Sequence, residues 1–344
     1  MKHLLEHPSE DWKSLLEEWL SSRDTARFRS TQILDHVKGR GVTTPTEMGN
    51  LPRELREQLV DGPLGPLGEI DTVQVSTDET RKYRFRCTDG RAIEAVWIPT
   101  EDRATLCVSS QAGCPARCSF CATGAGGFHR NLTAAEIVYQ FLTVRAERPV
   151  NQMVFMGMGE PLLNYDALAL ALRHLTETFR FSPRRITVST VGIPDRMEQL
   201  AEEFPQVRIA LSLHSAVDET RTRIVPVNKR HNLARLRATL RKVSDHARRI
   251  SLEYVVLKGV NDSPREATAL ARFASATAGH VNLLPFHPFP GAPHDGLDSR
   301  EMRRFQRQVE AEYSGRVTIR KSRGLDIAGA CGQLANLDGS ASTS

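Results

Sequence analysis

Three cysteines that lie close together are the residues of this 344-residue chain best suited to chemistry. Cys114, Cys118 and Cys121 have the spacing C-x-x-x-C-x-x-C, and Phe120 directly precedes the last of them. Thiolates at such intervals can bind the irons of one 4Fe-4S cluster, which normally takes four thiolate ligands. Because only three are present, one iron would stay open to a small molecule. The spacing therefore predicts one 4Fe-4S cluster with an open coordination site.

A zinc ion is the alternative occupant of these thiols, with His129 or Cys107 as its fourth ligand. Zinc sites usually combine two closely spaced pairs of ligands. The sequence offers no second pair beside the three cysteines. The cluster is therefore the favoured interpretation.

The composition is that of an ordinary globular protein, with 40% hydrophobic and 25% charged residues. Residues 1–20 carry several acidic side chains, unlike a signal peptide, and no apolar run is long enough for a membrane span. We therefore expect a cytoplasmic protein with reduced thiols and no membrane partner. The net charge of +5 is compatible with a polyanionic partner such as RNA.

The first part of the chain, residues 1–68, has the apolar spacing of a small helical accessory domain. Ser9 is the expected N-cap of its first helix, a second helix is expected over 30–38, and a third follows Pro52. Basic residues surround the second helix, where they could form a solvated face or contact RNA: Arg23, Arg27, Arg29, Lys38 and Arg40.

Residues 69–99 predict a β-hairpin that connects this accessory domain to the rest of the chain, with Asp89-Gly90 as its turn. The core domain is expected over 100–335, and the Ser-rich end, 336–344, is expected to be disordered. Strands alternate with helices from about residue 104. Expected strands cover 105–109, 152–156, 185–189, 207–213, 250–257, 280–285 and 316–320, and expected helices include 133–145, 165–178, 232–247 and 264–276.

Repeated strand–helix units predict an α/β protein with a parallel sheet, in the form of a partial (β/α)6 barrel. Catalytic groups of such barrels lie at the C-terminal ends of the strands. The three cysteines follow the first expected strand, Gly157–Pro161 follow the second, and Ser189 ends the third. Ser212–His214 end the fourth strand, and His287 follows the sixth. One edge of the barrel would thus carry the cluster and a ring of polar residues.

The segment Gly157–Pro161 could suggest a dinucleotide site, but it lacks the third glycine of that motif. Glycines at a strand end could instead let the backbone approach an amino group, and Glu160 could hold a positive one. An amino acid ligand on the open iron would present such a group.

The chain resembles the RlmN family of radical S-adenosylmethionine (SAM) enzymes, which is closely related to the Cfr methylases. The cysteine spacing is similar to that of radical SAM enzymes in general. The resemblance to RlmN extends over about residues 28 to 335, in the segments Cys107–Cys114, Cys121–Gly124, Arg130–Leu132, Met156–Leu162, Val188–Thr190, Leu211–His214, Ile224–Pro226, Pro288–Pro293, Arg323–Gly324 and Ala330–Leu334.

The resemblance implies methylation of carbon 2 of one adenosine in 23S rRNA, at the peptidyl-transferase centre. The adenosine 3′ to the anticodon of tRNA is a candidate second substrate. One 4Fe-4S cluster per chain and two SAM molecules per turnover are implied, together with an electron donor such as flavodoxin or ferredoxin.

The resemblance also assigns residues. Cys331 would take a methyl group from the first SAM, and a radical made from the second would activate that methyl group for addition to adenine. Cys107 would then attack the sulfur of Cys331 and leave a disulfide, while Glu94 would accept the ring proton. Cys114, Cys118 and Cys121 would ligate the cluster, and SAM would be lined by Gly159, Glu160, Ser189, Ser212, Leu213, His214 and His287.

Structural interpretations stand beside these roles. Glu94 could be an exposed strand carboxylate, and Cys87 a half-buried thiol without a role. Cys331 could be a buried core thiol, but its setting between Ala330 and Gly332 favours an exposed loop. His287 departs from the family, which usually has asparagine there, although a neutral imidazole can also donate and accept. Two other functions stay open: a Cfr-like enzyme acting on adenine carbon 8, and a non-catalytic, metal-containing RNA-binding protein.

Overall fold

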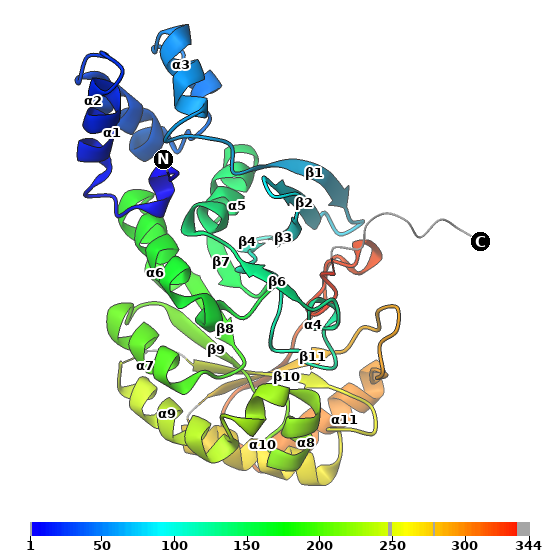
Figure 1. The fold of residues 1–344 in the computed structure, drawn as a ribbon. Helices are drawn as coiled ribbons and strands as arrows, with labels where there is room; N and C mark the ends of the chain where they lie inside the picture. The colour runs from blue at the N-terminus through cyan, green and yellow to red at the C-terminus, as the bar shows by residue number, and fades with distance from the viewer. Residues whose placement is uncertain (1, 247–249, 278, 336–344) are drawn as a thin grey trace.

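The computed structural model describes residues 2–246, 250–277 and 279–335 (Figure 1). The tail predicted over 336–344 lies outside the described residues. Most strands join one sheet in the order β1-β2-β3-β4-β7-β8-β9-β10-β11-β12. A separate two-stranded sheet pairs β5 (Gln111–Gly113) with β6 (Phe128–Asn131).

The parallel part of the sheet confirms the predicted barrel of strand–helix units. Each of its strands is a parallel neighbour of the next. They are β4 (Ala104–Cys107), β7 (Gln152–Phe155), β8 (Ile186–Thr190), β9 (Arg208–Ser212), β10 (Ile250–Val256), β11 (His280–Pro285) and the short β12 (Val317–Ile319). Within the described ranges, β1 and β12 each pair with a single neighbour, so hydrogen bonds leave the barrel open.

Helices follow the parallel strands and cover the outer face of the sheet (Figure 1). The predicted helix over 133–145 begins with a capping box, because the Thr133 hydroxyl accepts from the Glu136 N–H while the Glu136 carboxylate accepts from the Thr133 N–H. The helices are α4 (Ala122–Ala125), α5 (Ala134–Glu147), α6 (Tyr165–Arg173), α7 (Pro194–Glu203), α8 (Asp218–Ile224), α9 (Leu233–His246), α10 (Pro264–Thr277) and α11 (Ser299–Glu310). No described helix is both long and apolar enough to cross a membrane.

The predicted hairpin forms, with β2 (Arg81–Cys87) and β3 (Ala92–Pro99) joined by a turn in which Gly90 has φ 81°. A further strand that the sequence analysis did not predict, β1 (Gly68–Val75), pairs with β2. It lies at the edge of the sheet and is mostly exposed, so its sequence lacks the apolar alternation of a half-buried strand. Because β3 pairs with β4, these strands extend the main sheet.

The N-terminal elements are η1 (Leu4–Glu6), α1 (Trp12–Ser21), α2 (Arg29–Leu34), the π-helical η2 (Asp35–Gly39), η3 (Pro45–Glu47) and α3 (Arg53–Val60). The prediction that Ser9 caps the first helix was wrong. The chain makes a turn there, in which the Asp11 N–H donates to the Pro8 carbonyl, and the helix begins at Trp12.

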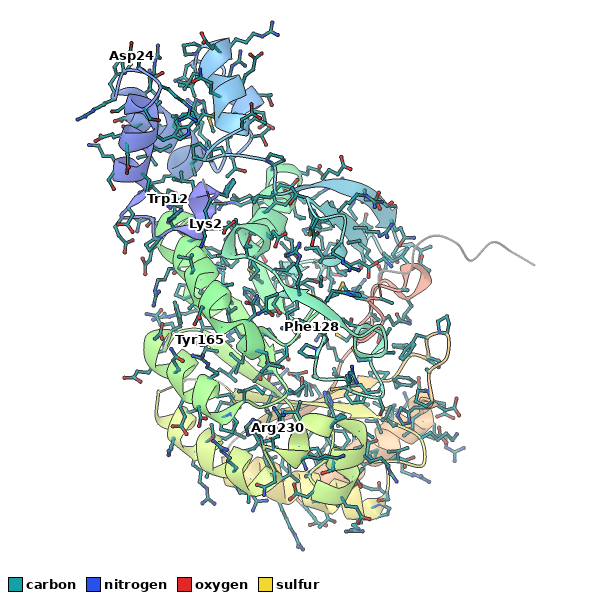
Figure 2. The ribbon with its side chains drawn as sticks, in the orientation of Figure 1. Lys2, Trp12, Asp24, Phe128, Tyr165 and Arg230 are labelled. Atoms are coloured by element: carbon teal, nitrogen blue, oxygen red, sulfur yellow. The ribbon has the colours of Figure 1, made fainter. Side chains whose placement is uncertain are left out.

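The N-terminal segment packs on the far end of α6, near Trp12 in Figure 2. The Trp12 and His174 rings lie 5.1 Å apart, and His174 Nε2 is 3.0 Å from the Leu5 carbonyl oxygen. His174 begins a π-helical turn, η5 (His174–Thr178), which continues α6. This contact ties the N-terminal helices to the barrel.

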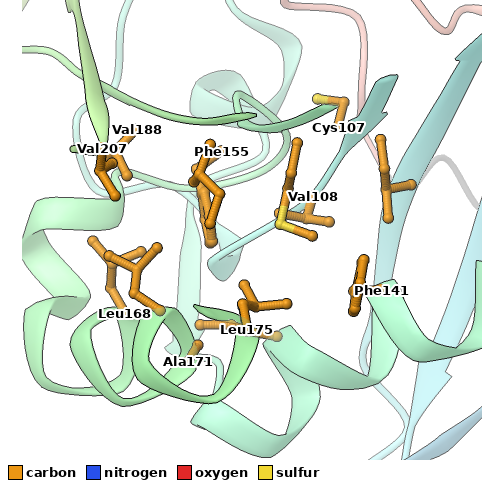
Figure 3. Close-up of a cluster of buried hydrophobic side chains, with 14 of the residues drawn as sticks. Cys107, Val108, Phe141, Phe155, Leu168, Ala171, Leu175, Val188 and Val207 are labelled. Carbon is orange, nitrogen blue, oxygen red and sulfur yellow. The ribbon is translucent and has the colours of Figure 1, made fainter. Parts of the chain in front are cut away.

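Apolar side chains from the sheet and from α5 and α6 form the core behind the first barrel strands (Figure 3). Phe141 of α5, Phe155 of β7 and Leu175 are almost wholly buried. This packed layer fixes the strands whose C-terminal ends carry the site.

Replacing Phe141 by alanine should lower the free energy of unfolding by about 3–5 kcal/mol, because the ring is fully buried and leaves a cavity. Phe128→Ala is the matched control. Its ring is 43% exposed, so the loss should stay below about 1 kcal/mol. Urea denaturation measures both, and equal losses would contradict this description of the core.

Candidate active site

Two adjoining cavities share lining residues at the C-terminal ends of the barrel strands. The smaller, of about 150 Å³, is lined by Cys114, Cys118 and Cys121. The larger, of about 1000 Å³, is lined by Cys107 and His287 and continues along the inside of the barrel. Both are lined by Met156, Glu253, Leu284, Pro285, Arg320 and Cys331.

The loop with the three cysteines is held by backbone hydrogen bonds. The Cys114 N–H donates to the Gly127 carbonyl at 2.8 Å, and the Ser119 N–H donates to the Ile224 carbonyl at 3.0 Å. Gly113, which starts the loop, has φ 76°, and a Cβ there would meet the Gly127 carbonyl oxygen at 2.1 Å. Only glycine fits this close approach, so the β5–β6 pair fixes where the loop begins.

Burial is the main electrostatic feature of the three thiols. It raises the pKa of Cys114 to about 12, and it also raises the pKa values of Cys118 and Cys121. Without positive charge nearby, these groups would stay protonated at neutral pH. Bound iron would supply that charge, since thiolates are its ligands in such clusters.

The donor geometry fits a cluster better than a single zinc ion. Within the described ranges, no three His, Cys, Asp or Glu side chains converge on a point where one metal ion could bind. Cluster thiolates need not converge, because each binds a different iron. The two candidate fourth ligands for zinc also lie elsewhere: His129 is exposed on β6, and Cys107 does not line the smaller cavity.

Glu160 is a buried carboxyl group on the wall of the smaller cavity. Its Oε2 accepts from the Val191 N–H at 2.7 Å, and its Oε1 accepts from the Leu162 N–H at 3.1 Å. Burial nevertheless raises its pKa to about 7. No cation pairs with it among the described residues, so a positively charged ligand in this cavity would be stabilised there.

His214 is neutral, because burial lowers its pKa to about 3. Its Nδ1 accepts from the Val255 N–H at 3.0 Å, which leaves the Nε2–H as a donor on the ring. Phe120, from the cysteine loop, contacts the ring edge to face with centroids 4.6 Å apart. Ser189 and Ser212 line the same cavity, and their hydroxyl oxygens are 3.2 Å apart.

Leu213 does not line either cavity. Its side chain is fully buried in the hydrophobic core, and its N–H donates to the Glu253 carbonyl at 3.0 Å. Among the predicted SAM residues, the structure therefore brings together Gly159, Glu160, Ser189, Ser212 and His214 on the wall of the smaller cavity.

Cys331 is exposed and lines both cavities, so the exposed loop that its sequence setting favours is confirmed. Cys107 is buried on the wall of the larger cavity, and burial raises its pKa to about 12, with a smaller contribution from Cys331. The Cys331 loop is bound to the cluster loop, because the Ala122 N–H donates to the Gly332 carbonyl at 2.8 Å. The two free thiols thus share one cavity, as their predicted roles require.

Glu94 is buried, so its interpretation as an exposed carboxylate was wrong. It pairs with Lys82, whose Nζ lies 3.4 Å from Oε1, and its Oε2 accepts from the Ala335 N–H at 3.1 Å. It does not line either cavity. Cys87, also buried and not half-buried, lies on β2 away from both cavities.

His287 lines the larger cavity but not the one with the cluster cysteines. Its Nε2 lies 2.6 Å from the Ser322 Oγ, and burial lowers its pKa, so the ring is neutral at neutral pH. Cys331 and Arg320 line the same larger cavity.

Sequence reasoning missed Glu253 and Arg320, which line both cavities. The nearby Cys331 thiol raises the pKa of Arg320, which keeps its charge beside that sulfur. Arg320 directly follows β12, so the rule for strand ends could have indicated it. Glu253 lies within β10 in no motif, and the sequence carries no signal for it.

The comparisons with known proteins agree with this site. Residues 108–271 match the Radical SAM superfamily. The solved structure of a radical SAM methyltransferase from Sphaerobacter thermophilus is similar with a TM-score of 0.89 and 38% identity, over 97% of this chain and 99% of that one. Fold and site thus define a radical SAM methyltransferase, which removes the non-catalytic alternative.

Curated relatives specify the family. A dual-specificity RNA methyltransferase RlmN from Halorhodospira halophila is 44% identical over 90% of this chain and 87% of its own length. A probable dual-specificity RNA methyltransferase RlmN from Thermus thermophilus is 43% identical over 90% of this chain and 89% of its own. The chain therefore belongs to the RlmN family, and the resemblance found in the sequence is confirmed.

Gly159→Ala should destabilise the protein by more than about 1 kcal/mol. Gly159 has φ 105°, and an added Cβ would lie 2.6 Å from the Cβ of Gln111. The Gln111 side chain would have to move, although its amide oxygen accepts a hydrogen bond from the Glu160 N–H. Gly126→Ala is the control, because its φ is −70° and the nearest atom to a Cβ is 3.6 Å away. Denaturation and SAM binding measure the effect, and identical behaviour of the two variants would contradict it.

Proposed function

We propose that this enzyme methylates carbon 2 of an adenosine in 23S rRNA, with the adenosine 3′ to the anticodon of tRNA as a second substrate. The names of its relatives support RNA as the substrate class. The observation that carries the proposal is the pair of free thiols, Cys107 and Cys331, on one large cavity that adjoins the three cysteines.

Cys114, Cys118 and Cys121 are the proposed ligands of one 4Fe-4S cluster per chain. Once bound, the cluster would supply the electron that cleaves SAM and starts radical chemistry, and a flavodoxin or ferredoxin would supply electrons to it. Ribosomal RNA and reduced thiols are found in the cytoplasm, where we expect the enzyme to act.

The smaller cavity is the proposed SAM site. Glu160 would accept hydrogen bonds from the α-amino group of SAM, and this cation would balance the buried carboxylate. Ser189, Ser212 and the Nε2–H of His214 offer hydroxyl and imidazole groups to the rest of the ligand. Leu213 would act on the ligand only indirectly, since its side chain is buried in the core and its N–H and carbonyl bond to Glu253 and Arg221.

Cys331 is the proposed methyl carrier. Carbon 2 of adenine has no lone pair that could attack a SAM methyl group directly, so the methyl group would pass through the Cys331 sulfur. Arg320 lines the same two cavities as Cys331, and its guanidinium interacts electrostatically with the Cys331 sulfur. Cys107 would later attack the same sulfur and release the methylated base, leaving a disulfide to be reduced.

Glu94 is the proposed acceptor of the ring proton. Because the Ala335 N–H occupies its Oε2, the segment that carries Cys331 would have to shift before Glu94 could reach a base in the cavity. The N-terminal arginines and lysines would add RNA affinity through phosphate contacts.

Binding of SAM should depend on pH through Glu160. Its raised pKa of about 7 means that the carboxylate is lost as pH falls through 7, so SAM affinity should fall about tenfold between pH 8 and pH 6. Glu160→Gln should bind weakly with a much flatter pH dependence, and Asp166→Asn, on exposed α6 surface, should behave like wild type. Calorimetry on the cluster-loaded protein measures this. Equal affinity of wild type and Glu160→Gln at both pH values would refute the assignment.

The two free thiols predict opposite trapping behaviour. With RNA, SAM and reductant, Cys107→Ala should accumulate protein covalently joined to RNA through Cys331, whereas Cys331→Ala should form no adduct. Cys87→Ala is the control, since that thiol lines neither cavity, and it should turn over normally. Gel electrophoresis and mass spectrometry detect the adduct. Normal product release by Cys107→Ala would disprove its role.

A further inference from the structure

Arg221 of α8 is a fully buried arginine that forms no ion pair with a carboxylate in the described part of the chain. Its Nε donates to the Leu213 carbonyl at 2.9 Å, and its Nη1 donates to the Asn228 Oδ1 at 2.8 Å. Its Nη2 donates to the carbonyls of Val191 and Ser212, at 2.6 and 3.2 Å. All of these acceptors are neutral oxygens.

Burying a charge without a counter-charge costs several kcal/mol, even when hydrogen bonds satisfy its donors. Arg130, a partly buried arginine, by contrast pairs with both Glu136 and Asp89. Around Arg221, burial lowers the pKa to about 10, so the protein environment itself disfavours the cation. Asp218 interacts electrostatically with Arg221 but forms no ion pair with it, and the Asn228 side chain hydrogen-bonds to both.

The position of Arg221 indicates what could balance its charge. It interacts electrostatically with Cys118, and the last residue of α8, Ile224, accepts from the Ser119 N–H in the cysteine loop. Arg221 itself does not line either cavity, and its donors are engaged, so it could not touch SAM or RNA. Any effect of Arg221 on a bound ligand would therefore be electrostatic.

We infer that Arg221 is the counter-charge of the proposed cluster and sets how easily the cluster is reduced. A 4Fe-4S cluster on three thiolates carries net negative charge, and reduction adds one more negative charge. A fixed cation behind Cys118 stabilises the reduced form more than the oxidised form. Arg221 is therefore a positioning residue for electron transfer, an inference that rests on the proposed cluster.

The test uses anaerobically reconstituted wild type, Arg221→Met, Arg221→Lys and Arg173→Met. Arg173 is the control for loss of a positive charge, because it is half-exposed on α6 and pairs with Glu203. Iron content is measured first, and about four irons per chain are expected for wild type. Absence of iron from wild type would overturn the proposed cluster and this inference together, whereas iron with an unchanged potential would overturn this inference alone.

The decisive readout is a redox titration of the cluster followed by electron paramagnetic resonance. At a fixed potential, the ratio of reduced to oxidised cluster should fall about tenfold in Arg221→Met, which is a shift of about 59 mV for one electron. Arg221→Lys keeps the charge and should stay within threefold of wild type, as should Arg173→Met. A ratio in Arg221→Met within threefold of wild type, or an equal fall in Arg221→Lys, would overturn the inference.

A purely structural role is separated by melting the proteins with and without the cluster. If Arg221 balances the cluster, loading should raise the unfolding temperature of wild type more than that of Arg221→Met. Equal increases in unfolding temperature would show that Arg221 serves only to hydrogen-bond the carbonyl groups around it. Should Arg221→Met fail to fold even without iron, the potential of Arg221→Lys decides: an unchanged value supports the charge role, and a tenfold change in ratio refutes it.

Discussion

Burial of three thiols in one small cavity is the constraint on which the rest of this structure depends. Thiolates in such a place need positive charge, and burial raises the pKa values of all three cysteines. Bound iron would supply this positive charge inside the cavity, and the buried guanidinium of Arg221 would add to it near Cys118. Glu160, with its pKa raised on the same wall, needs a cation in turn, and the ligand would bring it.

The strands at the sheet edge complete the site by holding the loop that carries Cys331. The Ser76 hydroxyl donates to Asp326, and the Gly324 N–H donates to Asp78 at 3.1 Å. The turn between β1 and β2 therefore holds the start of this loop through hydrogen bonds. Glu94 of β3 holds the end of the loop, because its carboxylate accepts a hydrogen bond from the Ala335 N–H. The added strands thus place an exposed thiol beside the cluster cysteines without covering it.

The parallel strands and the cysteine loop could be predicted because buried strands form apolar runs and the thiol spacing is specific. The exposed edge strand β1 escaped prediction, since nothing in its pattern marks a buried face. Burial of Glu94 depends on pairing with Lys82 across β2 and β3, which the sequence does not fix. Arg221 lies in a segment of mixed charge, after Asp218 and Glu219, and only tertiary packing reveals that it is buried. The rule for strand ends placed His287 near the chemistry but could not separate two adjoining cavities.

The central claim is that the enzyme methylates carbon 2 of an adenosine in 23S rRNA. Mass-spectrometric mapping of methylated adenosines tests this claim most directly. RNA from cells that lack the protein should be incubated with the cluster-loaded enzyme, SAM and a reductant, with Cys331→Ala as the blank. One new 2-methyladenosine in 23S rRNA is expected with wild type and none with Cys331→Ala. Methylation at carbon 8, or methylated product from Cys331→Ala, would contradict it.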